Sequence, residues 1–106
     1  MSQPDLETAL LWQIRLARLP DPVQQFMAVP GRRFRWDMAW PERKLLLEIQ
    51  GGVFTGGKHG RGGGILKDQE KLNLATIHGF RVLQVSAPHL RSGQALAWLK
   101  QALAPG

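Results

Sequence analysis

Two neighbouring stretches of the chain alternate in a way that predicts paired β-strands. The stretch RRFRWDMAW, residues 32–40, has a large apolar side chain at every second position from Phe34 onward. A period of two is the pattern of a strand with one buried face. The stretch KLLLEIQ, residues 44–50, follows after a Pro41-Glu42-Arg43 turn. It places Leu45, Leu47 and Ile49 on one face and Leu46, Glu48 and Gln50 on the other.

Helical and strand patterns on either side complete an α/β fold. Ser2 and Asp5 form a weak capping box for a helix over residues 4–18. Residues 25–29 predict a short edge strand, residues 65–78 a helix that ends at Gly79, and residues 80–85 another strand. Pro88 is expected to break the chain before a last helix over residues 92–102. The 106 residues therefore predict a single domain with a mixed sheet of about four strands flanked by helices.

The turn between the two alternating stretches sets their register. A four-residue connection from Pro41 to Lys44 pairs Trp40 with Leu45. If both apolar rows share one face, Asp37 lies opposite Glu48 and Arg35 opposite Gln50. Directly opposed side chains have β-carbons roughly 5 Å apart. The sequence therefore predicts two like-charged carboxylates close together on one face of the sheet.

Opposed carboxylates repel each other, and a cation between them removes that cost. Mg²⁺ prefers oxygen ligands, which Asp37, Glu48 and the carbonyl group of Ile49 can supply. Gln50, two residues beyond Glu48 on the same face, is placed to orient a water molecule or a phosphate. The alternative interpretation is that Arg33 and Arg35 neutralise the acids on a solvated face.

Charge narrows the choice of partner. The chain carries 14 Lys and Arg against 8 Asp and Glu, a net charge of +6, which favours a polyanion such as nucleic acid. A merely solvated basic surface is the alternative. The chain has no cysteine, no apolar run long enough for a membrane span, and no charge order typical of a secretory signal. We therefore expect no membrane association and a cytoplasmic location.

A glycine-rich segment follows the strand that carries Glu48. Glycine lets a backbone approach a ligand closely, and Lys58, His59 and Arg61 add cationic groups that could contact phosphates. The alternative is an ordinary surface loop. Residues 52–58 also match G-x-x-x-x-G-K, but position 59 is His rather than Ser or Thr, and more glycines follow instead of a helix start. A nucleotide-binding loop is therefore disfavoured.

Taken together, these motifs resemble the PD-(D/E)XK nuclease superfamily. The chain is most similar to small phage-type VRR-NUC nucleases and to the very-short-patch-repair endonuclease group. The motifs that carry the resemblance are Arg35-Trp36-Asp37, Glu48-Ile49-Gln50-Gly51-Gly52, His59, Asp68-Gln69-Glu70-Lys71 and Gly79-Phe80-Arg81-Val82-Leu83. The resemblance covers nearly the whole chain, and it implies a restriction-endonuclease-like core with helix–strand–strand–strand–helix–strand–helix order.

The resemblance also implies a function and a set of site residues. It implies Mg²⁺- or Mn²⁺-dependent hydrolysis of DNA, with Asp37, Glu48 and Ile49 at the metal and Glu7 as a supporting acid. Gln50 stands where the family usually has lysine. Lys71 or Lys67 could supply the missing charge, unless they form an ordinary solvated helix face. Arg35 and Lys67 join the loop cations as expected phosphate contacts.

Such a short chain leaves little surface for reading base sequence. We therefore expect cutting that is nonspecific or selective for branched DNA, in the cytoplasm of a bacterium or phage-infected cell. A homodimer would supply the two sites that cutting two strands requires. Two alternatives stay open: a catalytically inactive nucleic-acid-binding module on the same fold, and a nuclease directed at RNA.

Overall fold

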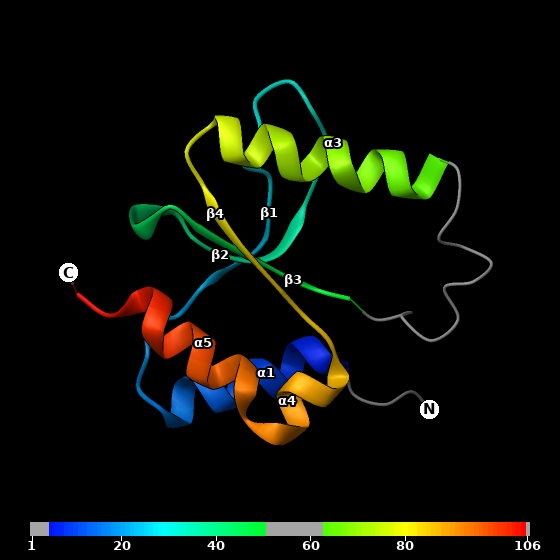
Figure 1. Cartoon of the computed structure of the whole chain (residues 1–106). Helices are drawn as coiled ribbons and strands as arrows, with labels where there is room; N and C mark the ends of the chain where they lie inside the picture. Colours follow the sequence, from blue (N-terminus) through cyan, green and yellow to red (C-terminus); the bar gives the residue numbers. More distant parts are fainter. Residues whose placement is uncertain (1–4, 51–62, 106) are drawn as a thin grey trace.

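A computed structural model describes residues 5–50 and 63–105 (Figure 1). The described residues form an α/β structure whose mixed sheet has four strands in the order β1-β2-β3-β4. The pairs β1/β2 and β2/β3 are antiparallel, and β3/β4 is parallel. The elements in chain order are α1 (Leu6–Leu16), β1 (Val23–Phe26), β2 (Trp36–Trp40), the 3-10 turn η1 (Pro41–Arg43), β3 (Leu45–Ile49), α3 (Gly63–Ile77), β4 (Arg81–Val85), α4 (Ala87–Ser92) and α5 (Gln94–Leu103).

The helices cover the sheet on both sides. Helix α3 lies on one side, and α1, α4 and α5 lie together on the other (Figure 1). Each side has its own apolar cluster. The larger contains Met38, Trp40, Leu45, Leu47 and Val85 with residues of α1, α4 and α5. The smaller contains Val29, Trp36, Ala39, Leu46 and Ala75. The predicted α/β class and flanked mixed sheet are confirmed.

Helix α1 is shorter than predicted at both described ends. Asp5 caps it, because its side chain accepts a hydrogen bond from the backbone N–H of Thr8 at 3.4 Å. Leu10 and Ile14 are fully buried, one turn apart on the inner face. The helix ends at Leu16, and Arg18 takes a left-handed conformation with φ of 62°. Ser2, the other half of the expected capping box, lies outside the described residues.

The hairpin register is confirmed. Trp40 pairs with Leu45, Ala39 with Leu46 and Met38 with Leu47. The chain reverses through the predicted four-residue connection, and Lys44 completes it in a left-handed conformation with φ of 53°. The edge strand β1 begins and ends earlier than predicted.

The predicted single apolar face of residues 34–40 is wrong. Met38 and Trp40 pack on the side of α1, but Trp36 and Phe34 pack with Leu46 and Ala75 on the side of α3. The alternation breaks at Asp37, where the β2–β3 pairing stops. Opposite Asp37, Gln25 has φ of 54°, a left-handed backbone that regular strands do not contain. Residues 32–35 therefore precede the strand instead of extending it.

The C-terminal part also differs from the prediction. Pro88 does not break the chain but stands in the first turn of α4, where a missing N–H costs nothing. His89 caps this helix, since its Nδ1 accepts the backbone N–H of Ser86 at 2.9 Å, and its ring lies 5.0 Å from that of Trp98. A second helix, α5, begins at Gln94, after Gly93 reverses the chain with φ of 86°.

Helix α3 ends at Ile77, one residue before the predicted end, and Gly79 follows it as the expected C-terminal glycine, with φ of 90°. An added β-carbon would meet only the Lys44 side chain, at 3.6 Å, so backbone conformation alone opposes a larger residue. We expect Gly79→Ala to lower the free energy of unfolding by about 1–2 kcal/mol in urea titrations. Gly64→Ala, inside the first turn of α3, is the control and should leave stability unchanged or raise it. Equal losses in both variants would contradict this explanation.

Candidate active site

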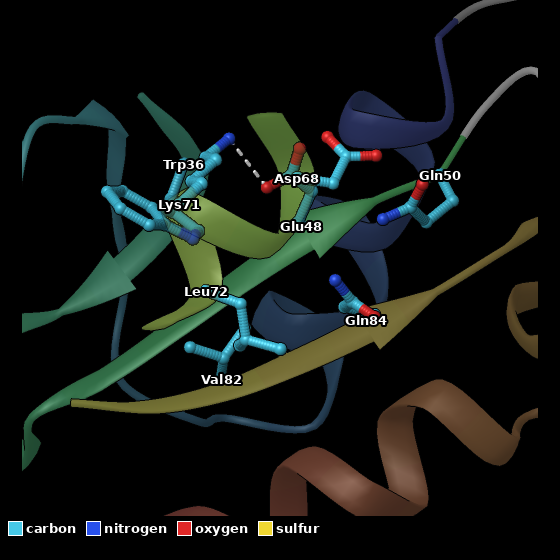
Figure 2. Close-up of a pocket in the computed structure, with 8 residues that line it drawn as sticks. All are labelled: Trp36, Glu48, Gln50, Asp68, Lys71, Leu72, Val82 and Gln84. Atoms are coloured by element: carbon cyan, nitrogen blue, oxygen red, sulfur yellow. Dashed lines mark hydrogen bonds and ion pairs between the residues drawn. The ribbon is translucent and has the colours of Figure 1, made fainter. Parts of the chain in front are cut away.

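Glu48 lies at the end of β3 on the α3 side of the sheet. Its Oε1 accepts a hydrogen bond from Lys71 Nζ at 2.7 Å, across from β3 to α3 (Figure 2). The two side chains are only 27% and 16% exposed, so this ion pair is partly shielded from water. Gln84 is the register partner of Glu48 on β4. The alternative interpretation, in which Lys71 belongs to an ordinary solvated helix face, does not hold.

The ammonium group of Lys71 has two further partners. It donates to the carbonyl oxygen of Arg35 at 2.7 Å and lies 4.8 Å from the centre of the Trp36 ring. A cation over an aromatic face is attracted by the ring quadrupole. The Lys71 side chain therefore links α3 to β3 and to the segment that leads into β2. The sequence offered a partial signal, because Lys67 and Lys71 share a helix face, but it did not show that Lys71 faces Glu48.

Asp37 takes the place of a backbone partner at the end of the hairpin. Its Oδ2 accepts the backbone N–H of Ile49 at 2.7 Å, just beyond the last β2–β3 pair. Its Oδ1 lies 3.5 Å from Gln25 Nε2. Since this N–H belongs to the peptide between Glu48 and Ile49, Asp37 binds the backbone directly after Glu48.

The two carboxylates do not share a face as predicted. Asp37 lines a hollow of about 210 Å³ on the α1 side, together with Asp5, Leu6, Glu7 and Ile49. Glu48 instead lines a smaller space on the α3 side. The break in alternation at Asp37 causes this difference, because it turns that side chain toward α1.

Glu7, the expected supporting acid, shares a hydrogen-bond partner with Asp37. Gln24 Nε2 donates to Glu7 Oε2 at 2.8 Å, and Gln25 Nε2 donates to Glu7 Oε1 at 3.3 Å. The Gln25 amide therefore lies between the two carboxylates of Glu7 and Asp37. Sequence reasoning missed both glutamines, because their placement depends on the left-handed backbone at Gln25.

The oxygen atoms that could hold a metal ion belong to two carboxylates, those of Asp37 and Glu48, and to the carbonyl group of Ile49. The described parts of the chain contain no group of three His, Cys, Asp or Glu residues arranged to hold one. Mg²⁺ often uses only one or two carboxylates and completes its shell with water. Asp37 and Glu48 supply hard carboxylate oxygens of the kind that Mg²⁺ prefers, although they lie on opposite sides of the sheet. A shared ion requires Glu48 to leave Lys71.

Gln50 is held at the same end of the sheet. Its backbone N–H donates to the carbonyl oxygen of Val85 at 2.7 Å, which completes the last parallel pair, Ile49 with Val85. Its side chain lines the small space that also contains Glu48 and Lys71 (Figure 2). Asp68, one turn before Lys71 on α3, lines this space as well and was not among the predicted site residues. Its helical spacing from Lys71 was the available signal.

The predicted phosphate contacts fall into two groups. Arg35 and Lys67 are described, and both are exposed. Lys58, His59 and Arg61 lie outside the described residues.

An ion pair between Arg32 and Glu70 holds residues 32–35 against α3, and the Arg32 guanidinium also stacks 4.6 Å from the centre of the Phe34 ring.

Arg32 lowers the pKa of the Glu70 carboxyl group, chiefly through their hydrogen bond. A carboxyl group with a lowered folded-state pKa stabilises the fold above its ordinary pKa and loses this contribution as pH falls through the lowered value. We therefore expect wild type to melt slightly higher than Glu70→Gln at pH 7, and the two to converge in acid, as pH falls below the lowered pKa of Glu70. A difference that persists unchanged in acid would contradict the role given to this ion pair.

No family model, curated protein or solved structure matches this chain. Among the described helices, none has the length and apolar character needed to cross a bilayer.

Proposed function

We propose that this protein is a metal-dependent DNA endonuclease with a restriction-endonuclease-like core. One observation carries the proposal. Asp37 and Glu48 lie on adjacent antiparallel strands, Asp37 binds the backbone N–H directly after Glu48, and a shielded lysine ammonium lies beside Glu48. Carboxylate oxygens with a nearby fixed cation are the groups that phosphodiester hydrolysis needs.

The order and direction of the strands support this assignment. A helix precedes three strands paired antiparallel in sequence, then α3 crosses over and β4 joins parallel to β3. This is the element order that the resemblance to PD-(D/E)XK nucleases implies. The acidic residues also fall on the elements that the resemblance assigns to them, with Glu7 on α1, Asp37 on β2 and Glu48 on β3.

The residues divide the chemical work in this proposal. Asp37, Glu48 and the carbonyl group of Ile49 would hold Mg²⁺ or Mn²⁺, which supplies a polarised phosphate and a water of lowered pKa when bound. The ammonium of Lys71 stabilises negative charge on the phosphate, in place of the lysine that the family usually has at the position of Gln50. The Gln50 amide orients the attacking water, and Glu7 holds Asp37 in position through Gln25.

The distribution of cations supports nucleic-acid binding beside the candidate site. At the end of the sheet that contains the β2–β3 turn, three cationic side chains donate hydrogen bonds to carbonyl oxygens near helix C-termini. These are Arg43 to Ala104 at 2.9 Å, Lys44 to His78 at 3.3 Å and Arg81 to Ala102 at 3.1 Å. Arg33, Arg35 and Lys67 are exposed on residues 32–35 and on α3, next to the candidate site. The exposed cations of residues 32–35 and α3 favour binding of the sugar–phosphate backbone next to the candidate site.

The test is hydrolysis of supercoiled plasmid, a four-way junction and a folded RNA, each with Mg²⁺, Mn²⁺ or EDTA. The proposal predicts cutting of DNA with either metal and none with EDTA. Cutting of RNA alone would establish the RNA-directed nuclease instead. Binding without cutting of any substrate would contradict the proposal.

A second function is a nucleic-acid-binding module that lacks catalysis. The ion pair between Glu48 and Lys71 favours it, because this pair satisfies the carboxylate without a metal. Glutamine at position 50 favours it as well. This alternative predicts that nucleic-acid affinity is the same with metal and with EDTA.

A further inference from the structure

We propose that the Lys71 ammonium is a single cationic position used in turn by two anions, Glu48 in the free protein and a backbone phosphate in the complex. The inference rests on the proposed function and concerns how the same site is regulated. Phosphate binding would release Glu48, so that the carboxylate becomes available to a metal ion only when nucleic acid is present.

The partners of Lys71 allow such an exchange. Of its three contacts, only Glu48 is charged, while the Arg35 carbonyl and the Trp36 ring are neutral. The neutral contacts come from the start of β2 and the segment before it, not from the strand that carries Glu48. When Glu48 leaves, the ammonium therefore stays in place with one anionic partner missing. A phosphate oxygen can fill that position with a hydrogen bond of the same charge-assisted kind.

The space around the pair makes the two anions mutually exclusive. The enclosed volume beside Glu48 and Lys71 is about 10 Å³, enough for about one water molecule. A phosphate group cannot enter while Glu48 occupies its present position. A wider hollow of about 340 Å³ adjoins this space and shares Gln50, Asp68, Leu72 and Gln84 with it. Phosphate can therefore approach from that side, and its arrival requires the Glu48 side chain to move.

Competition for one ammonium makes two binding events cooperative. Nucleic acid that binds Lys71 removes the cation that competes with metal for Glu48, so metal affinity rises. The reverse must hold to the same extent, because linkage between two equilibria is reciprocal. The proposal thus predicts that Glu48 weakens nucleic-acid binding in the absence of metal, and that it does so through Lys71.

The experiment measures this effect without metal and without cleavage. Fluorescence anisotropy in EDTA gives the affinity of a short DNA duplex for wild type, Glu48→Gln, Lys71→Met and the double variant. We expect Glu48→Gln to tighten binding about fivefold, the factor that corresponds to a shielded ion pair. In the Lys71→Met background, Glu48→Gln should change affinity by less than about twofold, because the competed cation is gone.

Asp68→Asn is the matched control, because it removes the same charge from the same space. Asp68 makes no ion pair with Lys71 in the described part of the chain. Because Asp68 also lines the hollow from which phosphate approaches, Asp68→Asn should tighten binding less than Glu48→Gln does, and to the same extent with and without Lys71. If Lys71→Met does not fold, the comparison of Glu48→Gln with Asp68→Asn still decides the question. Equal tightening by these two variants, or equal tightening by Glu48→Gln with and without Lys71, would overturn the inference.

A failure of this inference is distinguishable from a failure of the proposed function. If wild type cuts DNA with metal while Glu48→Gln changes affinity equally with and without Lys71, that pair of results would exclude the exchange of anions at Lys71 but support the nuclease function. If the effect of Glu48→Gln on affinity requires Lys71 but no substrate is cut, the Lys71 ammonium is the anion site of a nucleic-acid-binding module without catalysis.

Discussion

Replacing Asp37 by asparagine should reduce metal-dependent DNA cleavage by about 100-fold, a loss typical of changes at a metal centre. The substitution removes a charge but keeps an oxygen that can accept the Ile49 N–H, which Asp37 now accepts at 2.7 Å. The fold should therefore persist, and the loss should appear as a slower rate of plasmid nicking with Mg²⁺ or Mn²⁺.

The control is Asp5→Asn, which removes the same charge from the same hollow. Asparagine caps helices as well as aspartate does, so the cap on α1 should survive. Nicking by this variant should stay close to wild type. Equal losses in the two variants would mean that the charge of the hollow matters and not Asp37 itself, which would contradict its role at the metal.

The second large effect is expected at Trp36. Its side chain is 1% exposed, lies in the apolar cluster under α3, and contacts both the Phe34 ring and the Lys71 ammonium. Trp36→Ala should lower the free energy of unfolding by about 3–5 kcal/mol, through lost burial and the cavity left behind. That is a large share of the about 5–15 kcal/mol typical of a whole domain.

Trp12 offers a control of the same residue type, because its side chain is 61% exposed on α1. Trp12→Ala should change stability by no more than about 0.5 kcal/mol in the same urea titrations. A loss at Trp36 as small as that at Trp12 would contradict the assignment of Trp36 to the α3-side core.

Local patterns were enough to predict most of the fold. The register of the β2–β3 hairpin follows from the length of one turn and a period of two, and Gly79 marks the end of α3 because of its backbone freedom. The break at Asp37 could not be predicted in this way. It depends on a left-handed Gln25 in the neighbouring strand and on a hydrogen bond to Ile49, and both are contacts between segments.

The same limit applies to the candidate site. The sequence identified Glu7, Asp37 and Glu48 by residue type and order, and the structure places Glu7 beside Asp37 and Asp37 beside the peptide of Glu48. It did not identify which side of the sheet each acid faces. One irregular position reverses the face of every side chain on one side of it, and no periodicity within the strand itself reports that change.

This two-sided arrangement alters the expected route to a metal site. The sequence predicted a ready-made acidic pair, but Glu48 is already paired with Lys71, and the Gln25 amide lies between Asp37 and Glu7. Carboxylates satisfied in this way cost less to keep in the absence of metal than an unpaired, like-charged pair would. These acids are therefore satisfied without a metal, and the proposed metal site requires them to rearrange.

The measurement that tests the central claim most directly is a titration of Mn²⁺ into the protein, with bound metal measured by electron paramagnetic resonance. It is made with and without a nuclease-resistant duplex, for wild type, Asp37→Asn and Glu48→Gln. The proposed site predicts saturable Mn²⁺ binding by wild type that is lost or strongly weakened in both variants, although the two carboxylates lie on different sides of the sheet. Binding that survives both substitutions, or no binding by wild type under either condition, would contradict a metal centre at the Glu48–Ile49 peptide.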